Sequence, residues 1–272
     1  MSIFESVILG IVQGLTEFLP VSSSGHLVLL QKIFNINEPG LFFDTMLHAG
    51  TLTAVFIVLW KDIWSLICKP IQKLTLFLII ATIPAVITAL LFKDKIEEIF
   101  KTANLLGICF LITTCFLITA ELISRRKTVN NEQLTINKEM SWIDALFIGI
   151  MQAIAILPGI SRSGATISGA LFRKLDRDFA ARFSFLLSIP AILGALALQT
   201  KDLITKSAAT NSENINIIAV SAGTVSAAIV GFFAVKFMLK IIREKSLFGF
   251  AIYTGVLGTL VLLDQFVTKI VF

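Results

Sequence analysis

The chain has 272 residues, of which 56% are hydrophobic and 15% charged, and its mean hydropathy is +0.88. A soluble domain carries about 25% charged residues, so the composition excludes that class and indicates a polytopic α-helical membrane protein. The net charge of +5 does not indicate nucleic-acid binding, because basic cytoplasmic loops give a membrane protein this balance and no basic domain stands outside the apolar blocks.

In chain order, the sequence divides into two interrupted apolar regions, each followed by three uninterrupted blocks. The interrupted regions lie near residues 3–31 and 145–172, and Pro, Ser and Gly break both in the middle. Irregular backbone survives at membrane depth only where protein or water covers it, so each region predicts a re-entrant helical hairpin. The alternative is one kinked spanning helix with a surface helix. The blocks are long enough to span a bilayer and lie near 42–60, 74–92, 104–123, 183–200, 216–236 and 247–266.

The two interrupted regions resemble each other at an offset of 139 residues, from which only the Leu-Pro step departs, by one residue. This offset relates Gly10 to Gly149, Gln13 to Gln152 and Gly25 to Gly164. A hairpin leaves the chain on the side it entered, whereas three crossings change sides, so the second half must be inverted relative to the first. We therefore expect a single transmembrane domain over 1–272, with repeat 1 at 1–125, a polar linker at 126–141 and repeat 2 at 142–272.

The distribution of basic residues predicts the orientation of this layout. The predicted topology places seven Lys and Arg residues on the side of the N-terminus and fifteen on the opposite side. Cytoplasmic loops carry the excess of positive charge, so both termini are expected outside the cell membrane.

Arg162 is the most informative single residue, because it lies within the second interruption between Ser161 and Ser163. A guanidinium at membrane depth is rarely left unpaired, and its planar fork matches a phosphate group. A helix that begins near Gly164 would add backbone N–H groups at its positive end. We expect an anion cradle that also includes Thr166. The alternative is an arginine that pairs with a buried carboxylate for purely structural reasons.

Glu17 supplies the opposite charge in the first interruption, and Gln13 lies four residues before it on the same helix face. The carboxylate could hold a divalent cation, act as a general base or pair with Arg162. Asp44 and His48 are also four apart and are expected to line the outer mouth of the site; the alternative is an ordinary interfacial pair.

Ser22, Ser23 and His26 follow Glu17 within the same interruption. His26 could be a nucleophile, a proton donor to a leaving phosphate, or the group that activates a serine. The two serines are candidate nucleophiles or phosphate ligands, and their alternative role is to cap the returning helix.

These motifs resemble a known family. The run from Gly14 to His26 resembles the first signature of the undecaprenyl-diphosphatase (bacitracin-resistance) family, and the run from Pro158 to Thr166 resembles its second. The resemblance implies hydrolysis of undecaprenyl diphosphate to undecaprenyl phosphate and inorganic phosphate. It also implies recycling of the lipid carrier of peptidoglycan synthesis, bacitracin resistance, a place in the bacterial cell membrane, and a site open to the outer face.

The resemblance further implies a divalent cation, Mg²⁺ or Ca²⁺, as cofactor. The family's paired acidic motif has Glu or Gln followed by Glu four residues later, and here these positions are Gln13 and Glu17. We expect Glu17 to be a ligand, with Gln13 and Asp44 as further candidates. The expected catalytic residues are Glu17, Ser23, His26 and Arg162, and Ser22, Ser161, Ser163, Gly164 and Thr166 are expected to bind phosphate with Arg162.

A rival function class remains open, because inverted repeats with broken helices also describe many carriers. The same cradle could move a lipid phosphate across the membrane without cleaving it. The sequence allows a homodimer as well as a monomer.

Overall fold

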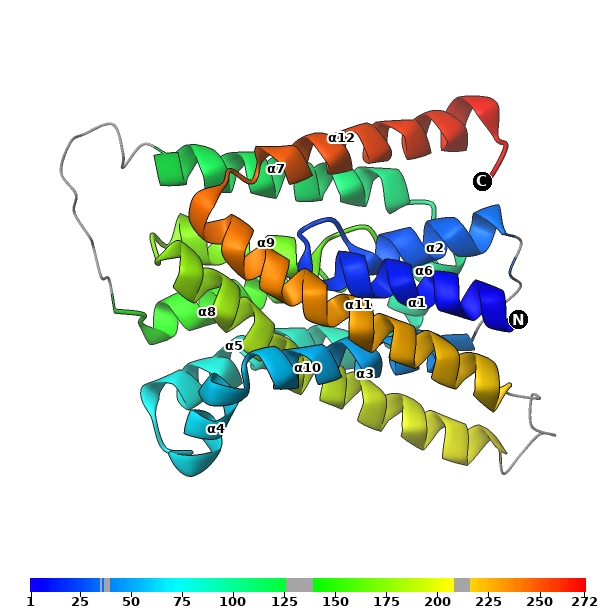
Figure 1. Cartoon of the computed structure of the whole chain (residues 1–272). Helices are drawn as coiled ribbons and strands as arrows, with labels where there is room; N and C mark the ends of the chain where they lie inside the picture. The colour runs from blue at the N-terminus through cyan, green and yellow to red at the C-terminus, as the bar shows by residue number, and fades with distance from the viewer. Residues whose placement is uncertain (35, 37–39, 126–138, 208–215) are drawn as a thin grey trace.

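The computed structural model describes residues 1–34, 36, 40–125, 139–207 and 216–272, and all regular secondary structure within these ranges is helical (Figure 1). The helices are α1 (Ile3–Phe18), α2 (Ser23–Ile33), α3 (Gly40–Val58), α4 (Trp60–Cys68), α5 (Lys73–Leu91), α6 (Lys93–Thr102), α7 (Leu106–Arg125), α8 (Trp142–Ile154), α9 (Arg162–Phe172), α10 (Arg177–Ser207), α11 (Ile217–Glu244) and α12 (Phe248–Leu263), which continues into a turn of π-helix over Asp264–Thr268.

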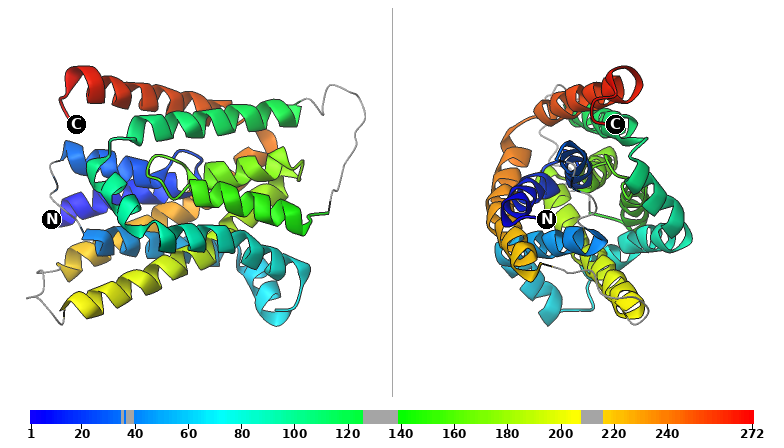
Figure 2. Two further views of the ribbon diagram at one scale, coloured as in Figure 1. Left: turned by 180° about the vertical axis from the view of Figure 1, so that it is seen from behind. Right: turned by 90° about the vertical axis from the view of Figure 1, so that its right-hand side faces the viewer.

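Both interrupted regions form hairpins, as predicted. Helix α2 returns alongside α1, and α9 returns alongside α8. The two hairpins enter the bundle from opposite ends, and their connecting loops meet in its middle (Figures 1 and 2). The surrounding helices cover these loops, which satisfies the requirement that irregular backbone be shielded from lipid.

The predicted spanning helices are also present. Five helices of the described chain, α5, α7, α10, α11 and α12, are long and apolar enough to cross a membrane. Helices α3 and α4, which meet at a bend of 81°, pass the same test only as a pair. The protein is therefore a multi-pass α-helical membrane protein. Three boundaries differ from the prediction by six residues or more: α10 begins at Arg177 and ends at Ser207, and α11 continues to Glu244. Both helices extend past the apolar block into charged turns, which hydropathy alone does not include.

The sequence reading missed the two short helices α4 and α6. Each is amphipathic and joins two spanning helices, α4 between α3 and α5, and α6 between α5 and α7. Their apolar residues recur at helical spacing, as in Ile63, Leu66 and Ile67 of α4. That period was the available signal, but neither segment is long enough to be found as a spanning block.

Several contacts follow the 139-residue offset. Capping boxes begin α1 at Ser2–Glu5 and α8 at Ser141–Asp144, and serine N-caps begin α2 at Ser22 and α9 at Ser161. Helix α1 packs along α11, and α8 packs along the corresponding helix α5 of the other half. The two termini lie at the same end of the bundle (Figure 1). These pairings are those that an inverted repeat would produce; the symmetry itself stays a prediction, and linker residues 126–138 lie outside the described chain.

Buried ion pairs join the helices at the end of the bundle opposite the termini. Arg177 donates both terminal nitrogens to Glu121 at 3.2 Å, and Arg173 donates to Asp144 at 2.5 Å. Glu121 and Asp144 are 3% and 0% exposed, and an acid at such depth is costly without its partner. The first pair joins α10 to α7, and the second joins the C-terminal end of α9 to the start of α8.

Candidate active site

The tips of the two hairpins touch directly. The hydroxyl of Ser163 donates to the carbonyl of Leu19 at 3.0 Å. A Cβ atom on Gly25 would lie 2.9 Å from the Cα of Gly159, closer than real Cβ contacts, and Gly159 itself has a φ of +94°. Only a residue without a side chain fits this approach at low cost. The glycines thus allow the two broken helices to meet inside the bundle.

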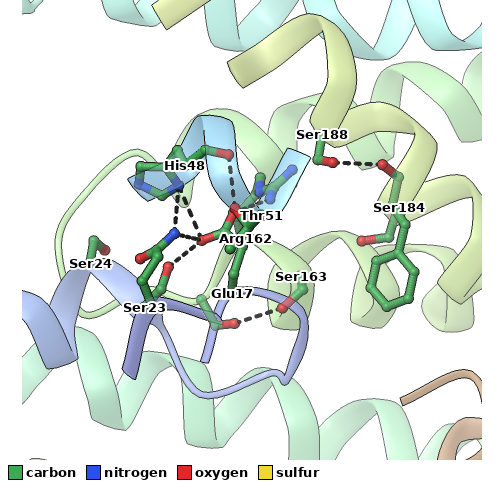
Figure 3. Close-up of polar contacts among 12 residues, drawn as sticks. Glu17, Ser23, Ser24, His48, Thr51, Arg162, Ser163, Ser184 and Ser188 are labelled. Carbon is green, nitrogen blue, oxygen red and sulfur yellow. Dashed lines mark hydrogen bonds and ion pairs between the residues drawn. The ribbon is translucent and has the colours of Figure 1, made fainter. Parts of the chain in front are cut away.

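Glu17, the last but one residue of α1, is the centre of the polar cluster at these tips (Figure 3). The residue is 5% exposed. Its Oε2 accepts hydrogen bonds from Ser23 Oγ at 2.5 Å and from Gln13 Nε2 at 2.9 Å, and its Oε1 accepts one from Arg162. A buried carboxylate with donors on both oxygens is well stabilised in its charged form.

Ser23 and Arg162 occupy equivalent backbone positions. Ser23 is the first residue of α2, Arg162 is the first residue of α9, and the 139-residue offset relates them. They approach Glu17 from different hairpins and bind its two oxygens separately. The first N–H groups of a helix lack intrahelical partners and carry a partial positive charge. Two positive helix ends therefore lie beside one carboxylate.

Arg162 retains unused hydrogen-bonding capacity. Its Nη2 pairs with Glu17, whereas its buried Nη1 has no hydrogen-bond partner among the described residues. A guanidinium that served only as a structural counter-ion would be expected to have its buried donors satisfied. The free donor is therefore suited to an anion that arrives at the tips.

The other predicted phosphate ligands hold the hairpin tips in this structure. Ser161 caps α9 by accepting from the N–H of Gly164 at 3.0 Å, and its own N–H donates to Thr113. The hydroxyl of Thr166 donates to the carbonyl of Arg162 at 2.8 Å, and its Oγ1 lies 2.6 Å from Ser184 Oγ. Of the predicted cradle, Arg162 alone is shown in contact with Glu17. The phosphate-binding roles of Ser161, Ser163, Gly164 and Thr166 stay predictions.

Ser22 and His26 lie on the far side of the same turn. Ser22 has a φ of +72°, rare for a residue with a side chain, and its Oγ caps α2 by accepting from the N–H of Gly25 at 3.3 Å. One ring nitrogen of His26 contacts the carbonyl of Ser22 at 2.6 Å and the other contacts the hydroxyl of Tyr253 at 2.7 Å. His26 therefore stabilises the turn that precedes Ser23. Its catalytic role stays a prediction.

The predicted pair Asp44 and His48 divides between two environments. Asp44 accepts from Gln31 of α2 at 3.0 Å, and no hydrogen bond or ion pair among the described residues joins it to Glu17. His48 instead reaches the centre of the cluster, with Nδ1 2.9 Å from Gln13 Nε2 and 3.3 Å from Glu17 Oε2. The sequence reading placed His48 at the outer mouth. The packing of α3 against α1 brings it to the carboxylate.

The expected cation can be compared with the donors that are present. Within the described residues, no group of three or more His, Cys, Asp or Glu side chains could hold a metal ion. Gln13 Oε1 is buried and has no hydrogen-bond partner there, while the same amide binds Glu17. One carboxylate and one amide oxygen fit a magnesium ion that keeps its waters and binds substrate phosphates. They do not form a cage made of protein alone.

An apolar groove lies between α3, α4, α5 and α10. Its volume is about 550 Å³, and Thr75 and Thr82 are the only polar residues that line it. Leu186 of the groove lies two residues after Ser184, and Phe56 lies five residues after Thr51, which bonds to His48. The groove therefore offers a hydrocarbon environment on helices that also reach the polar cluster. Its lining includes Phe56, Ile63, Leu78, Ile83, Leu186 and Pro190.

The chain was compared with known proteins. Residues 6–260 match the family described as "Bacitracin resistance protein BacA". A protein of Carboxydothermus hydrogenoformans named undecaprenyl-diphosphatase is 46% identical over 97% of this chain and 98% of its own length. Undecaprenyl-diphosphatase 3 of Bacillus cereus is 49% identical over 98% of both chains, and the undecaprenyl-diphosphatase of Halothermothrix orenii is 40% identical over 97% of this chain and 98% of its own.

The family match spans most of the chain and includes both hairpin tips, and the relatives align over nearly their full length. The chain therefore belongs to the bacitracin resistance protein family.

Proposed function

We propose that this chain is an integral membrane phosphatase that hydrolyses undecaprenyl diphosphate to undecaprenyl phosphate and inorganic phosphate. The observation that carries the proposal is the arrangement at Glu17, where a serine hydroxyl and a guanidinium from two opposed half-helices bind the two oxygens of one buried carboxylate. The shared name of the relatives favours hydrolysis over transport.

A diphosphate would be attracted to the tips by their charge. The N-termini of α2 and α9 and the free Nη1 of Arg162 all favour an anion. A phosphate group matches the planar fork of Arg162 as well as a carboxylate does. The substrate would therefore compete with Glu17 for Arg162, and loss of that partner would make the carboxylate a better proton acceptor.

The geometry favours Ser23 as the nucleophile. Its hydroxyl already donates to Glu17 at 2.5 Å, the relation that a nucleophile needs with its general base. As Ser23 Oγ attacks the terminal phosphorus, Glu17 takes the hydroxyl proton. The bond from that phosphorus to the bridging oxygen breaks, and undecaprenyl phosphate leaves with the electron pair. Both ring nitrogens of His26 are engaged elsewhere, which makes His26 the less favourable nucleophile.

Water completes the cycle. Its oxygen attacks the phosphorus of phosphoserine 23, and Glu17 returns the proton to Ser23 Oγ as the bond between that oxygen and phosphorus breaks. The protons of the water leave with inorganic phosphate. Arg162 offsets the negative charge that develops on the phosphoryl oxygens in both steps.

The cofactor is proposed as a divalent cation, Mg²⁺ or Ca²⁺, with Glu17 as its protein ligand. Gln13 is a further candidate, although its Nε2 and not its Oε1 faces the carboxylate in this structure. A bound cation supplies neutralisation of phosphate charge. Asp44 is the weaker candidate, because its carboxylate is bound to Gln31.

We further propose that the prenyl chain lies in the apolar groove and that the site opens to the outer face, with both termini outside. The support for the groove is its almost wholly apolar lining and its place on α3, the helix that also carries His48. The support for the orientation is the excess of Lys and Arg on the end opposite the termini.

Purified protein in detergent tests the enzyme, because transport cannot be observed where no second compartment exists. We expect phosphate release from undecaprenyl diphosphate, and mass spectrometry of rapidly quenched enzyme should find phosphate on Ser23. Lipid translocation in vesicles without phosphate release in detergent would contradict the proposal and support a carrier.

A further inference from the structure

We infer that His48 is a positioning residue, which fixes the orientation of the Gln13 amide and thereby the carboxylate of Glu17. The inference rests on the proposed function and deepens it, because it assigns a role in the reaction to a residue of α3. His48 lies on neither hairpin, 31 residues after Glu17 along the chain.

Three atoms of the cluster form a small triangle. Gln13 Nε2 lies 2.9 Å from Glu17 Oε2 and 2.9 Å from His48 Nδ1, and the third side, between His48 Nδ1 and Glu17 Oε2, is 3.3 Å. Gln13 is 0% exposed. Its amide is therefore held by protein contacts and not by water.

Counting donors assigns the protons within the triangle. An amide nitrogen has two N–H donors, and here one points at Glu17 and the other at His48. We assign His48 Nδ1 as the acceptor of the second N–H, which places the ring proton on Nε2. The imidazole is 29% exposed, which leaves that N–H able to reach water.

The same count shows what is lost without His48. The two ends of a glutamine amide have almost the same shape and differ in their hydrogen bonds. With the Nδ1 acceptor removed, one N–H of Gln13 is left buried and unpaired, and the amide can turn over. Its Oε1 would then face Glu17 Oε2, and two acceptors would repel each other at the oxygen that binds Ser23.

The orphan oxygen of Gln13 supports this reading. Gln13 Oε1 is buried without a partner among the described residues, although an unsatisfied buried acceptor costs free energy. The amide remains in this orientation because both of its N–H groups are satisfied, by Glu17 and by His48. His48 thus determines which end of Gln13 faces the base.

The test compares His48→Leu with His48→Gln, because the amide oxygen of glutamine can accept from Gln13 whereas leucine cannot. We expect His48→Leu to lower kcat about tenfold, a usual effect for a residue that orients a primary ligand, and to change KM less than twofold. His48→Gln should restore most of kcat. Thr53→Ala on the exposed side of α3 is the matched control and should keep the wild-type rate.

A double-mutant cycle with Gln13→Ala separates positioning from a structural role. If His48 acts through Gln13, His48→Leu should have no further effect on kcat in the Gln13→Ala background. Independent, multiplicative losses would overturn the inference, and so would equal losses in His48→Leu and His48→Gln. Absence of phosphate release by the wild-type protein would instead contradict the proposed function itself.

Discussion

The two hairpin tips share a backbone plan and differ in their chemistry. Both begin their returning helix with a serine N-cap that binds the N–H of a glycine three residues later, at Ser22–Gly25 and Ser161–Gly164. The next residue after each cap points at the same carboxylate, yet it is Ser23 in the first hairpin and Arg162 in the second. One plan thus provides a hydroxyl from one side and a positive charge from the other.

Glu17 has no acidic counterpart in the second hairpin. The 139-residue offset relates Glu17 to Ile156, so the carboxylate belongs to the first hairpin alone. The second break is also longer, from Ala155 to Ser161 against Leu19 to Ser22. Two symmetric tips would bring two like groups together, whereas the observed asymmetry pairs a base and hydroxyl with a cation. The candidate site therefore depends on the differences between the two tips and not on the backbone plan that they share.

The largest effect is expected at the hydroxyl of the first tip. Ser23→Ala should lower phosphate release by at least about 10³-fold, because loss of a nucleophile is among the most severe single changes in an enzyme. Its neighbour Ser24 contacts Ser22 and is not among the ligands of Glu17, so Ser24→Ala is the control. Comparable rates for the two variants would exclude Ser23 as the nucleophile.

At the second tip, Arg162→Lys tests whether phosphate binding requires the planar guanidinium of Arg162 or only a positive charge. We expect phosphate release to fall about 10²-fold, because lysine keeps the charge but cannot bind a phosphate bidentately. Arg173 of the same hairpin pairs with Asp144 far from the tip, so Arg173→Lys is the control. Steady-state kinetics measure both, and a normal rate for Arg162→Lys would contradict the phosphate-binding role.

The packing of the second tip against α7 can be disturbed without changing a polar side chain. In Gly159→Ala the new Cβ would lie 2.7 Å from the Cβ of Cys109 and 2.8 Å from the carbonyl of Leu106, at a φ of +94°. We expect a loss of about 1–3 kcal/mol in the free energy of unfolding in detergent, the usual cost of such strain, together with reduced activity. Gly194→Ala meets nothing within 4 Å and should be neutral or slightly stabilising. Equal stability of the two variants would show that the second tip tolerates displacement from α7.

The smallest effect is expected in the groove, to which neither hairpin contributes a lining residue. Ile83→Trp should raise KM for undecaprenyl diphosphate by roughly threefold to tenfold, since displacement of apolar contacts costs on the order of 1 kcal/mol. KM for a short prenyl diphosphate should not change. Ile229→Trp, at a residue of α11 that is 57% exposed and outside the groove lining, is the control. An equal change for both substrates would exclude the groove as the site of the chain.

Local sequence patterns determined the scaffold of this protein. The six spans, the two hairpins and the importance of Glu17 and Arg162 followed from hydropathy and from polar residues within apolar runs, because lipid requires every backbone group to be satisfied nearby along the chain. Tertiary structure alone decided how the side chains meet. The pair between Arg162 and Glu17 joins residues 145 apart, and His48 reaches Glu17 from a third helix. Such contacts depend on how whole helices pack, and no periodicity along the chain records the angle or the register of that packing.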